Sequence, residues 1–477
     1  MRPITFAAVS SAALASLLLT ACASTRDVDT RLPAAFEAPP QPQGAVALDR
    51  WWLAFEDPEL TGLVDQALAA SPDARSAAAR LREARATRAG ALTAFLPQGN
   101  PTASASRRES EVIEGTEIDI PGFSTGGVTE TYSAAFDVSW ELDLFGRIFA
   151  ARRAANAELA VARLDYESSR ASLAANVADS YFQVRGLAIQ LAEAQQSVRI
   201  QEGISRTADT LAQRGLGARV DVDRIAGDLA QARSQAEALT AELQAARRTL
   251  LILVGRGIEP TANLPAEPRV GAIPPVPASI PGEILARRPD VRQAEARLAS
   301  QLGQYDYAKL AFFPTFRLTP GIGISRTEQP GYSATTQNWT IGGNVSVPLL
   351  DIPRLLSDLK VQNARVEQAA IAYEQAVQTA FGEAENALVQ LAADRRRVDL
   401  LAAGERQAAS AYQAAQRGYA AGLTDLTALL QAEASWRAVR SQYTAAQVQA
   451  LRRAVQTYKA LGGGWPAETA PTNKEAR

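Results

Sequence analysis

The sequence predicts a mainly α-helical protein with a small β part, built from two copies of one structural unit. First, the stretches that begin at Ser71 and Arg288 share the patterns Pro-Asp-x-Arg, Ala-Arg-Leu and Ala-Phe-x-Pro at equal spacing. Second, two very long runs, at about 149–213 and 355–417, contain neither a proline nor a convincing break and indicate long helices. Third, stretches that precede these runs alternate apolar and polar residues, as half-exposed strands do.

The internal repeat extends over most of the chain. Pro289 follows Pro72 by 217 positions, whereas "VPLLDIPR" follows "WELDLFGR" by 207 and "AQRGYAAGLTDL" follows "AQRGLGARVDV" by 203. The connections between matching blocks therefore differ in length. A period of roughly 200 residues is far too long for a solenoid repeat. Each copy is expected to contain a helix, two strands, a very long helix, a tight turn and a returning helix.

The composition excludes several classes of function. The chain has 49 basic and 51 acidic residues, so it lacks the basic surface that phosphate backbones require, and no nucleic acid is expected as a partner. Histidine is absent, which excludes imidazole catalysis and His-ligated metal sites. A single cysteine excludes an intrachain disulfide. No catalytic constellation and no metal site are visible, so we do not expect an enzyme.

The first residues have the pattern of a bacterial lipoprotein signal peptide. Arg2 supplies the positive charge, an apolar segment follows, and Leu19-Thr20-Ala21 precedes Cys22 as in a lipobox. Segment 1–21 is therefore expected to be removed and Cys22 to carry a covalent lipid, with no other cofactor. The alternative is an ordinary signal peptide cleaved after Ala23. No later run of about 18 apolar residues indicates a membrane helix.

Two strands are predicted in each copy of the repeat. In the second copy, residues 316–324 and 339–349 show the alternation, and residues 101–106 form the weakest of the four predicted strands. In the first copy the alternation is clearest, and its apolar face comprises Tyr132, Ala134, Phe136, Val138, Trp140 and Leu142.

The long helical runs need partners along their whole length. The first would extend for about 95 Å at the usual helical rise. Its many alanines, with Leu and Val at spacings of three and four, would let helices pack closely on both flanks. This pattern favours a cylinder of helices. A filamentous coiled coil is the alternative, but it would leave the four strands without a role.

Each long run ends at a glycine turn. Gly215 and Gly422 lie in the two turns, and the returning helices are expected to restart at Asp221 and at Thr424 or Asp425, which can cap a helix N-terminus. The returning helices are expected to end near residues 254 and 460.

Four strands with one apolar face suggest a lipid-facing β-barrel shared between chains. A membrane-spanning sheet must close, because an open edge leaves backbone groups without hydrogen-bond partners in hydrocarbon. Four strands are too few to close, and an eight-stranded barrel is filled by its own side chains. The sequence therefore predicts a trimer with a barrel of about twelve strands.

Four motifs, taken in order over the duplication, resemble the TolC-like outer-membrane efflux factors, most closely the NodT-type lipoproteins. They are "WWLAFEDPELTGLVDQAL" at Trp51, "WELDLFGR" at Trp140, "LARRPDVRQAEARL" at Leu285 and "AFFP" at Ala311. The resemblance covers nearly the whole mature chain. It implies a homotrimeric tunnel, in which a 12-stranded outer-membrane β-barrel continues as a long periplasmic α-helical barrel, with most of the mass in the periplasm of a Gram-negative bacterium.

The resemblance also implies how the chain is organised. Trp51 and Trp52 are expected to be core aromatics rather than an anchor for the start of the mature fold. The expected segments are a signal peptide at 1–21, an N-terminal and equatorial segment at 22–70, a first repeat at 71–254, a Pro-rich equatorial connector at 255–288, a second repeat at 289–461 and a C-terminal tail at 462–477.

The resemblance places a gate and an adaptor-docking region at the helical turns. The candidate residues there are Arg214, Arg219, Asp221, Arg417, Leu423, Thr424 and Asp425. Simple helix capping is the alternative for each of them. Tyr132, Trp140 and Trp339 are expected to lie at membrane interfaces, where aromatic girdles occur.

The expected function is a passive exit duct of a tripartite efflux pump for small molecules and drugs. Its expected partners are two further copies of the chain, outer-membrane lipid, a periplasmic adaptor (membrane fusion protein) and an inner-membrane transporter of the resistance-nodulation-division (RND) class. The alternatives are the exit duct of a type I protein secretion system and a lipid-anchored coiled-coil scaffold without a pore.

Overall fold

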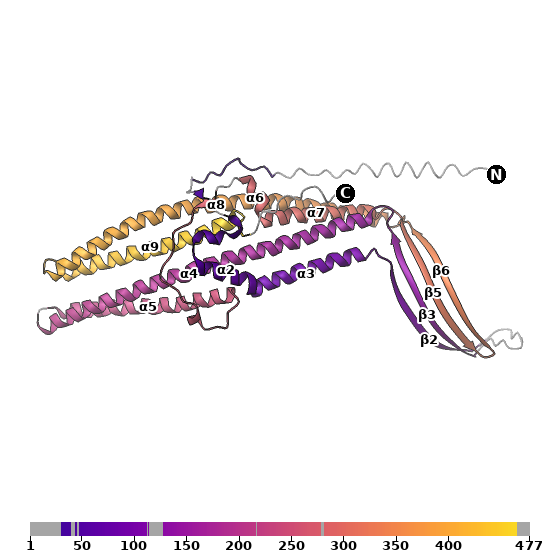
Figure 1. Cartoon of the computed structure of the whole chain (residues 1–477), viewed down its shortest axis with the longest axis horizontal. Helices are drawn as coiled ribbons and strands as arrows, with labels where there is room; N and C mark the ends of the chain where they lie inside the picture. Colours follow the sequence, from indigo (N-terminus) through magenta and orange to yellow (C-terminus); the bar gives the residue numbers. More distant parts are fainter. Residues whose placement is uncertain are drawn as a thin grey trace. The chain divides into compact units, whose positions relative to one another are not determined.

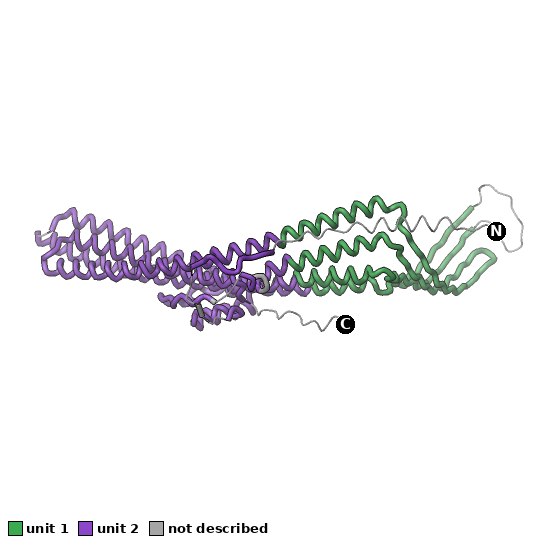
Figure 2. The backbone as a smooth tube through the Cα atoms, turned by 90° about the horizontal axis from the view of Figure 1, so that it is seen from above, with its two compact units in different colours: residues 1–28, 83–161, 295–373 green, residues 29–82, 162–294, 374–477 purple. Residues whose placement is uncertain are grey.

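The computed structural model describes residues 30–39, 43–44, 47–111, 113, 127–215, 217–277 and 281–464. The predicted signal peptide, Cys22 and most of the predicted C-terminal tail lie outside these residues. The chain divides into two compact units, coloured separately in Figure 2. Unit 1 comprises residues 1–28, 83–161 and 295–373, and unit 2 comprises residues 29–82, 162–294 and 374–477.

Two very long helices confirm the main prediction. Helix α4 (Arg147–Gln213) has 67 residues and helix α8 (Ile352–Ala420) has 69, so each is about 100 Å long. Helix α8 begins three residues earlier than predicted, because Pro353 lies in its first turn, where a missing amide hydrogen costs nothing. No described helix has a stretch long and apolar enough to cross a membrane.

In unit 2 each long helix pairs with a returning helix of 35 residues (Figure 1). Helix α5 (Arg219–Leu253) is tied to α4 by the ion pair between Arg233 and Glu202, at 2.8 Å. Helix α9 (Leu426–Ala460) is tied to α8 by Trp436, whose indole N–H donates to Glu405 at 3.0 Å. The two hairpins, α4–α5 and α8–α9, are matching parts of the two copies of the repeated unit.

Helices α4 and α9 approach each other closely within unit 2. A Cβ atom on Gly186 would lie only 2.6 Å from Val448 Cγ2, so glycine is required at this crossing. This explains a glycine in the interior of a long helix, where it otherwise costs about 1 kcal/mol.

The aromatic core of unit 2 lies near the ends of the returning helices. The 3-10 helix η1 (Leu48–Phe55) carries Trp51 and Trp52, both buried. Trp51 stacks on Tyr458 of α9, with ring centroids 5.7 Å apart. The prediction of core aromatics is therefore confirmed.

The connector between the repeats is held by hydrogen bonds to its backbone. Tyr458 Oη donates to the carbonyl of Pro275 at 2.6 Å, and Arg395 donates to the carbonyl of Pro274. Within the connector, the two-residue strand β4 (Val276–Pro277) pairs in parallel with β1 (Gln43–Gly44). A proline-rich segment has few amide donors of its own, so side chains from the helices position it.

The remaining described elements are shorter. They are α2 (Pro58–Ala70), α3 (Pro72–Thr93), η2 (Thr261–Asn263), α6 (Pro281–Arg287) and α7 (Pro289–Leu310). Helices α3 and α7 are the matching helices that open the two repeats, and each begins at the proline of its Pro-Asp-x-Arg pattern.

Unit 1 contains a four-stranded antiparallel sheet in the order β2-β3-β5-β6 (Figure 1). The strands are β2 (Gln98–Ser110), β3 (Gly127–Leu142), β5 (Thr315–Gln329) and β6 (Tyr332–Ser346). All four predicted strands are therefore present, and the one predicted most weakly forms β2, with 13 residues. Among the described residues, β2 and β6 each pair on one side only.

Candidate functional site

The sheet of unit 1 presents a continuous apolar face. The register aligns Pro101, Phe136, Ile322 and Trp339 in one row across the four strands. Trp339 is 77% exposed, and Phe136 and Ile322 are also exposed. Exposed apolar side chains on one face of a sheet are what lipid-facing strands require.

The opposite face of the sheet is polar. Ser104, Ser133, Ser325 and Thr336 form one row there. The hydroxyls of Ser104 and Ser133 lie 2.8 Å apart, and those of Ser325 and Thr336 lie 2.9 Å apart. The sheet therefore has one face that suits lipid and one face that suits water.

The three predicted interface aromatics all lie on the apolar face. Along β6 this face runs from Gln337 to Trp339 and Ile341, so Trp339 is the first apolar residue beyond a polar one. On β3, Tyr132 is the first residue of this face after Glu130, to which its hydroxyl donates at 3.0 Å, but the register aligns it with Thr335 and not with Trp339. Trp140 lies near the other end of β3. The apolar stretch of β3, from 134 to 142, is about 26 Å long, close to the apolar band of membrane barrels.

The glycine turn between α4 and α5 corrects one prediction. Helix α5 begins at Arg219, with Ala218 before it and no side-chain cap, so the restart predicted at Asp221 is wrong. Asp221 lies in the first turn of the helix, where its charge is favourable near the helix N-terminus, and it pairs with Arg224 at 3.6 Å. Arg214 and Arg219 are exposed. Gly215 has φ +74°, which favours glycine at this turn.

The glycine turn between α8 and α9 is held by two side-chain hydrogen bonds. Asp425 caps α9, and its carboxylate accepts the amide hydrogen of Ala428 at 2.7 Å. Thr424 donates its hydroxyl to the carbonyl of Ala415 at 3.3 Å. Leu423 is 83% exposed. The side chains of Thr424 and Asp425 therefore stabilise the backbone of the turn, while Leu423 remains exposed at its tip.

The structure does not bring the two turns together. Arg417 donates to the carbonyl of Gln413 in its own helix, at 3.3 Å. In the part of the chain that the structure describes, no hydrogen bond or ion pair joins a candidate residue of one turn to the other turn. A contact between them would have to come from other copies of the chain.

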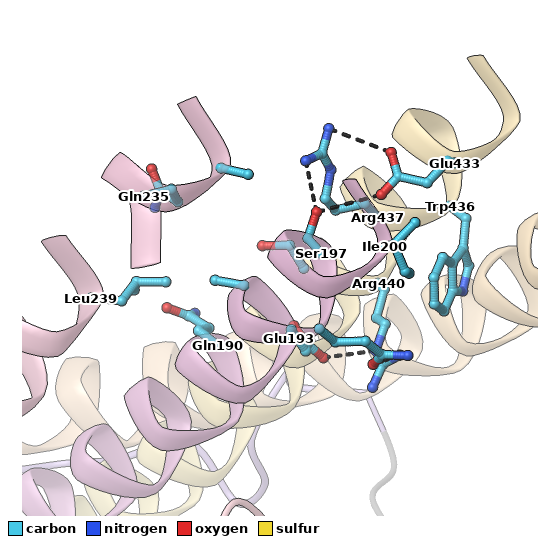
Figure 3. A pocket seen from close by; sticks show the side chains of 14 residues that line it. Gln190, Glu193, Ser197, Ile200, Gln235, Leu239, Glu433, Trp436, Arg437 and Arg440 are labelled. Atoms are coloured by element: carbon cyan, nitrogen blue, oxygen red, sulfur yellow. Dashed lines mark hydrogen bonds and ion pairs between the residues drawn. The ribbon is translucent and has the colours of Figure 1, made fainter. Parts of the chain in front are cut away.

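The sequence interpretation missed a polar cluster between α4 and α9, in which Ser197, Gln201 and Glu433 are buried (Figure 3). Arg440 of α9 donates to Glu193 of α4 at 3.0 Å, and Arg437 donates to Ser197 at 2.9 Å. Beside them lies a cavity of about 140 Å³. Glu433 is 1% exposed there, and burial raises the pKa of its carboxyl. The spacing of Glu433, Arg437 and Arg440 on one face of an alanine-rich helix was the available signal.

Comparisons with known proteins identify the same architecture. The family model described as outer membrane efflux protein matches residues 63–256 and 280–463, one segment in each repeat. The pyoverdine export outer membrane protein OpmQ of Pseudomonas putida is 30% identical over 465 residues, which cover 95% of this chain and 97% of OpmQ.

Two solved structures superpose over almost the whole chain. The outer-membrane channel OprN is 31% identical, with a TM-score of 0.80 over 93% of this chain and 100% of OprN. The open state of the MtrE outer membrane channel of Neisseria gonorrhoeae is 27% identical, with a TM-score of 0.80 over 92% of this chain and 97% of MtrE.

Proposed function

The chain belongs to the outer membrane efflux protein family, and from this premise we propose that three copies form the exit duct of a tripartite efflux pump. The protein is a TolC-like outer-membrane efflux channel of a Gram-negative bacterium, with its larger part in the periplasm. What we propose beyond this is the number of copies, the mode of conduction, the partners and the roles of single residues.

The observation that carries the trimer is the sheet with two open edges. Strands β2 and β6 each lack a second neighbour among the described residues, although the sheet exposes an apolar face. In hydrocarbon the free backbone groups at such edges would each cost several kcal/mol. Pairing β2 of one copy with β6 of the next satisfies both edges at once, and three copies supply about twelve strands.

We propose that the duct conducts passively and performs no chemistry. Among the described residues no cluster of three metal-ligating side chains is present, and the chain contains no histidine. The energy would come from an inner-membrane transporter of the RND class, coupled through a periplasmic adaptor. OpmQ is named for pyoverdine export, which supports a small-molecule cargo for this chain as well.

We propose that a lipid on Cys22 anchors each copy beside the barrel. Residues 30–39 contact α8 within unit 2, where Phe36 stacks on Phe381 with ring centroids 5.9 Å apart. The backbone N–H of Glu37 also donates to Glu385 at 3.1 Å. A docked N-terminal segment supports an anchor at the start of the mature chain.

We propose that the two helical turns form the periplasmic gate and the adaptor-docking region. The exposed Arg214, Arg219 and Leu423 are free to contact other copies or an adaptor, whereas Thr424 and Asp425 also hold their own turn. Asp221 and Arg417 lie beside them with local partners. A ring of such turns from three copies would narrow the tunnel at this end.

Three measurements test the proposed duct. Cross-linking and native mass spectrometry of the detergent-solubilised protein should give a trimer, and planar bilayers should show discrete conductance steps. A stable monomer that still conducts would overturn the shared barrel, and a trimer without conductance would favour a scaffold. In a deletion strain, increased drug susceptibility would support efflux, whereas loss of a secreted protein alone would support type I secretion.

A further inference from the structure

A polar recess lies in unit 2 where α9 ends and α7 begins, with α4 and α8 beside it. Its volume is about 680 Å³, within the range of small-molecule sites. Its hydroxyls and amides come from Ser168 and Ser172 of α4, Asn386 and Gln390 of α8, and Gln456 of α9. None of these five side chains has a hydrogen-bond partner in the part of the chain that the structure describes. All of them are therefore available to a solute.

Arg288 is the buried cation of the recess, and its donors are fully used. It is 7% exposed, and its guanidinium donates to both carboxylate oxygens of Asp290, to Oε2 of Glu383, and to the carbonyls of Ala380 and Ala460. These are five hydrogen bonds for the five N–H groups of a guanidinium. Arg288 therefore positions the two carboxylates, while Oε1 of Glu383 has no partner among the described residues and stays available.

The available cations of the recess belong to α9. Lys459 has no side-chain hydrogen bond or ion pair with any described residue, and Arg453 uses only its Nε, which donates to Asp394 at 3.4 Å. Within the described chain, no ion pair joins either cation to Glu383 or Asp290, although all four side chains line the same recess. Charges of opposite sign therefore face one space without meeting each other.

The recess lies on the side of α9 that points away from the aromatic core. Tyr458, which stacks on Trp51, is two residues from Gln456, which lines the recess, so the two side chains lie on nearly opposite sides of the helix. The core side is covered by η1 and by the connector, where Pro275 accepts the hydrogen bond of Tyr458. In a tube of helices such an added layer has to lie outside, because inside it would block the passage. The recess therefore faces the inside of the proposed duct.

We propose that this recess is a binding site for amphoteric cargo on the inner wall of the duct. A solute with a carboxylate and an ammonium group places the carboxylate against Lys459 and Arg453 and the ammonium group against Glu383. The hydroxyls and amides of the recess supply hydrogen bonds between the two ends. A solute with a carboxylate alone leaves Glu383 unmatched. The inference rests on the proposed duct and names the class of solute that its wall recognises.

The charges of the recess are partly exposed, which suits a transient site. The side chains of Arg453 and Glu383 are 29% and 54% exposed, so water weakens their attraction for a charged solute. A duct has to release what it binds, because conduction requires sites that are favourable enough to enter and weak enough to leave. We therefore expect a weak and rapidly reversible complex.

Two penicillins provide a matched pair of probes for this site. At about pH 6 ampicillin carries a carboxylate and an ammonium group, whereas benzylpenicillin has the same core and carboxylate but lacks the amine. Saturation-transfer NMR with the detergent-solubilised full-length protein should show several-fold tighter binding of ampicillin. Equal affinity for the two penicillins, or no binding of either, would overturn the amphoteric site.

Substitutions of Glu383 and Lys459 separate the two ends of the solute. Glu383→Gln keeps an acceptor for Arg288 but removes the charge, so it should reduce the affinity for ampicillin to that for benzylpenicillin. Lys459→Gln should weaken both penicillins several-fold, because both carry the carboxylate. The control Lys360→Gln removes the same charge from an exposed position of α8 outside the recess and should change neither affinity. Equal effects of Lys459→Gln and Lys360→Gln would contradict the proposed site.

A conservative variant tests whether Lys459 acts through its charge. Lys459→Arg keeps a cation at the same position, so both affinities should stay close to those of the wild type. A loss in Lys459→Arg as large as that in Lys459→Gln would show that packing, and not charge, is responsible, and the site would then be wrong.

Conductance separates this inference from the proposed duct. In planar bilayers ampicillin should interrupt the wild-type current more often than benzylpenicillin does, and Glu383→Gln should remove this difference. If the protein conducts but both penicillins interrupt the current equally, the recess inference is wrong and the duct stands. If the protein does not conduct, the duct is wrong, and the NMR affinities still decide whether the recess binds amphoteric solutes.

Discussion

Arg452 of α9 donates two hydrogen bonds, each of 2.8 Å, to the carboxylate of Asp179 of α4. The two residues belong to different copies of the internal repeat and are 273 positions apart in the sequence. This fork-to-fork pair is the first polar contact between the two hairpins on the side of the aromatic core. It fixes the register of α4 against α9, on which the more distal contacts depend.

Loss of this pair should lower stability by a modest amount. Both side chains are partly exposed, so Arg452→Leu should reduce the free energy of unfolding by about 1 kcal/mol, less than a buried pair would. Thermal unfolding of the detergent-solubilised protein measures the change. Arg233→Leu, which breaks the more exposed Arg233–Glu202 pair, is the matched control and should have a smaller effect. An equal loss in both variants would contradict the assigned role.

Removal of the acidic residues at the two turns should open the closed state. Asp425→Ala combined with Asp221→Ala removes a helix cap and a first-turn charge, at a cost of about 1 kcal/mol for the cap. We expect a higher single-channel conductance in planar bilayers. Asp425→Asn keeps a capping side chain but removes the charge, so it separates the effect of the lost cap from the effect of the lost charge. Unchanged conductance in the double variant would remove these residues from the gate.

A charge on the apolar face of the sheet should destabilise the inserted protein. Ile341 is exposed within the apolar stretch of β6, so Ile341→Arg should cost about 2–4 kcal/mol, the range for arginine at mid-membrane. Thr340→Arg places the same charge on the opposite, polar face of the same strand. Denaturant unfolding from lipid vesicles should show a large loss for the first variant and a small one for the second. The reverse order would place the lipid on the other face.

Asp290 should make a pH-dependent contribution to stability. Burial alone would raise its pKa, but the hydrogen bond from Arg288 and the positive charge of that residue outweigh burial and hold the pKa below the ordinary 3.8. The contribution is therefore present above that value and is lost as the pH falls through the lower folded pKa.

Thermal unfolding of Asp290→Asn compared with wild type checks this prediction. The variant should be less stable at neutral pH, and the difference should shrink once the pH falls below about 3.8. A difference that stays constant over the whole range would show that geometry, rather than charge, is responsible.

Cys22→Ser should abolish lipid attachment. The variant should show a changed electrophoretic mobility and should lack the mass of the lipid, while the barrel strands still assemble because they do not depend on the anchor. Native mass spectrometry should therefore still give a trimer. An unaltered mass and mobility would remove the lipobox assignment.

The two long helices, the four strands and the duplication were predictable because each leaves a local pattern. Long runs without proline indicated α4 and α8 to within three residues at each end. Strict alternation at Tyr132 to Leu142 placed the apolar face of β3. The prediction failed at Asp221, because backbone geometry at Ala218, and not the nearest aspartate, decides where α5 begins.

The polar cluster between α4 and α9 was not predictable from the sequence. Glu433, Arg437 and Arg440 follow a helical spacing that also suits a solvated face, and Ser197 and Gln201 are unremarkable in a long helix. Only the meeting of α4 with α9 places these groups against one another. A helical period shows which residues share a face, but it does not show which helix, more than 200 positions away, covers that face.

The sequence by itself determined the elements of this protein: their lengths, their order, their two-fold repetition and the alternation that makes one face of each strand apolar. These are local properties, set by backbone sterics and by the periods of helix and strand. Only the tertiary structure decided that Glu433 of α9 is buried against Ser197 and Gln201 of α4. Burial and the loss of water depend on which surfaces meet, and that is settled by packing between segments far apart in the chain.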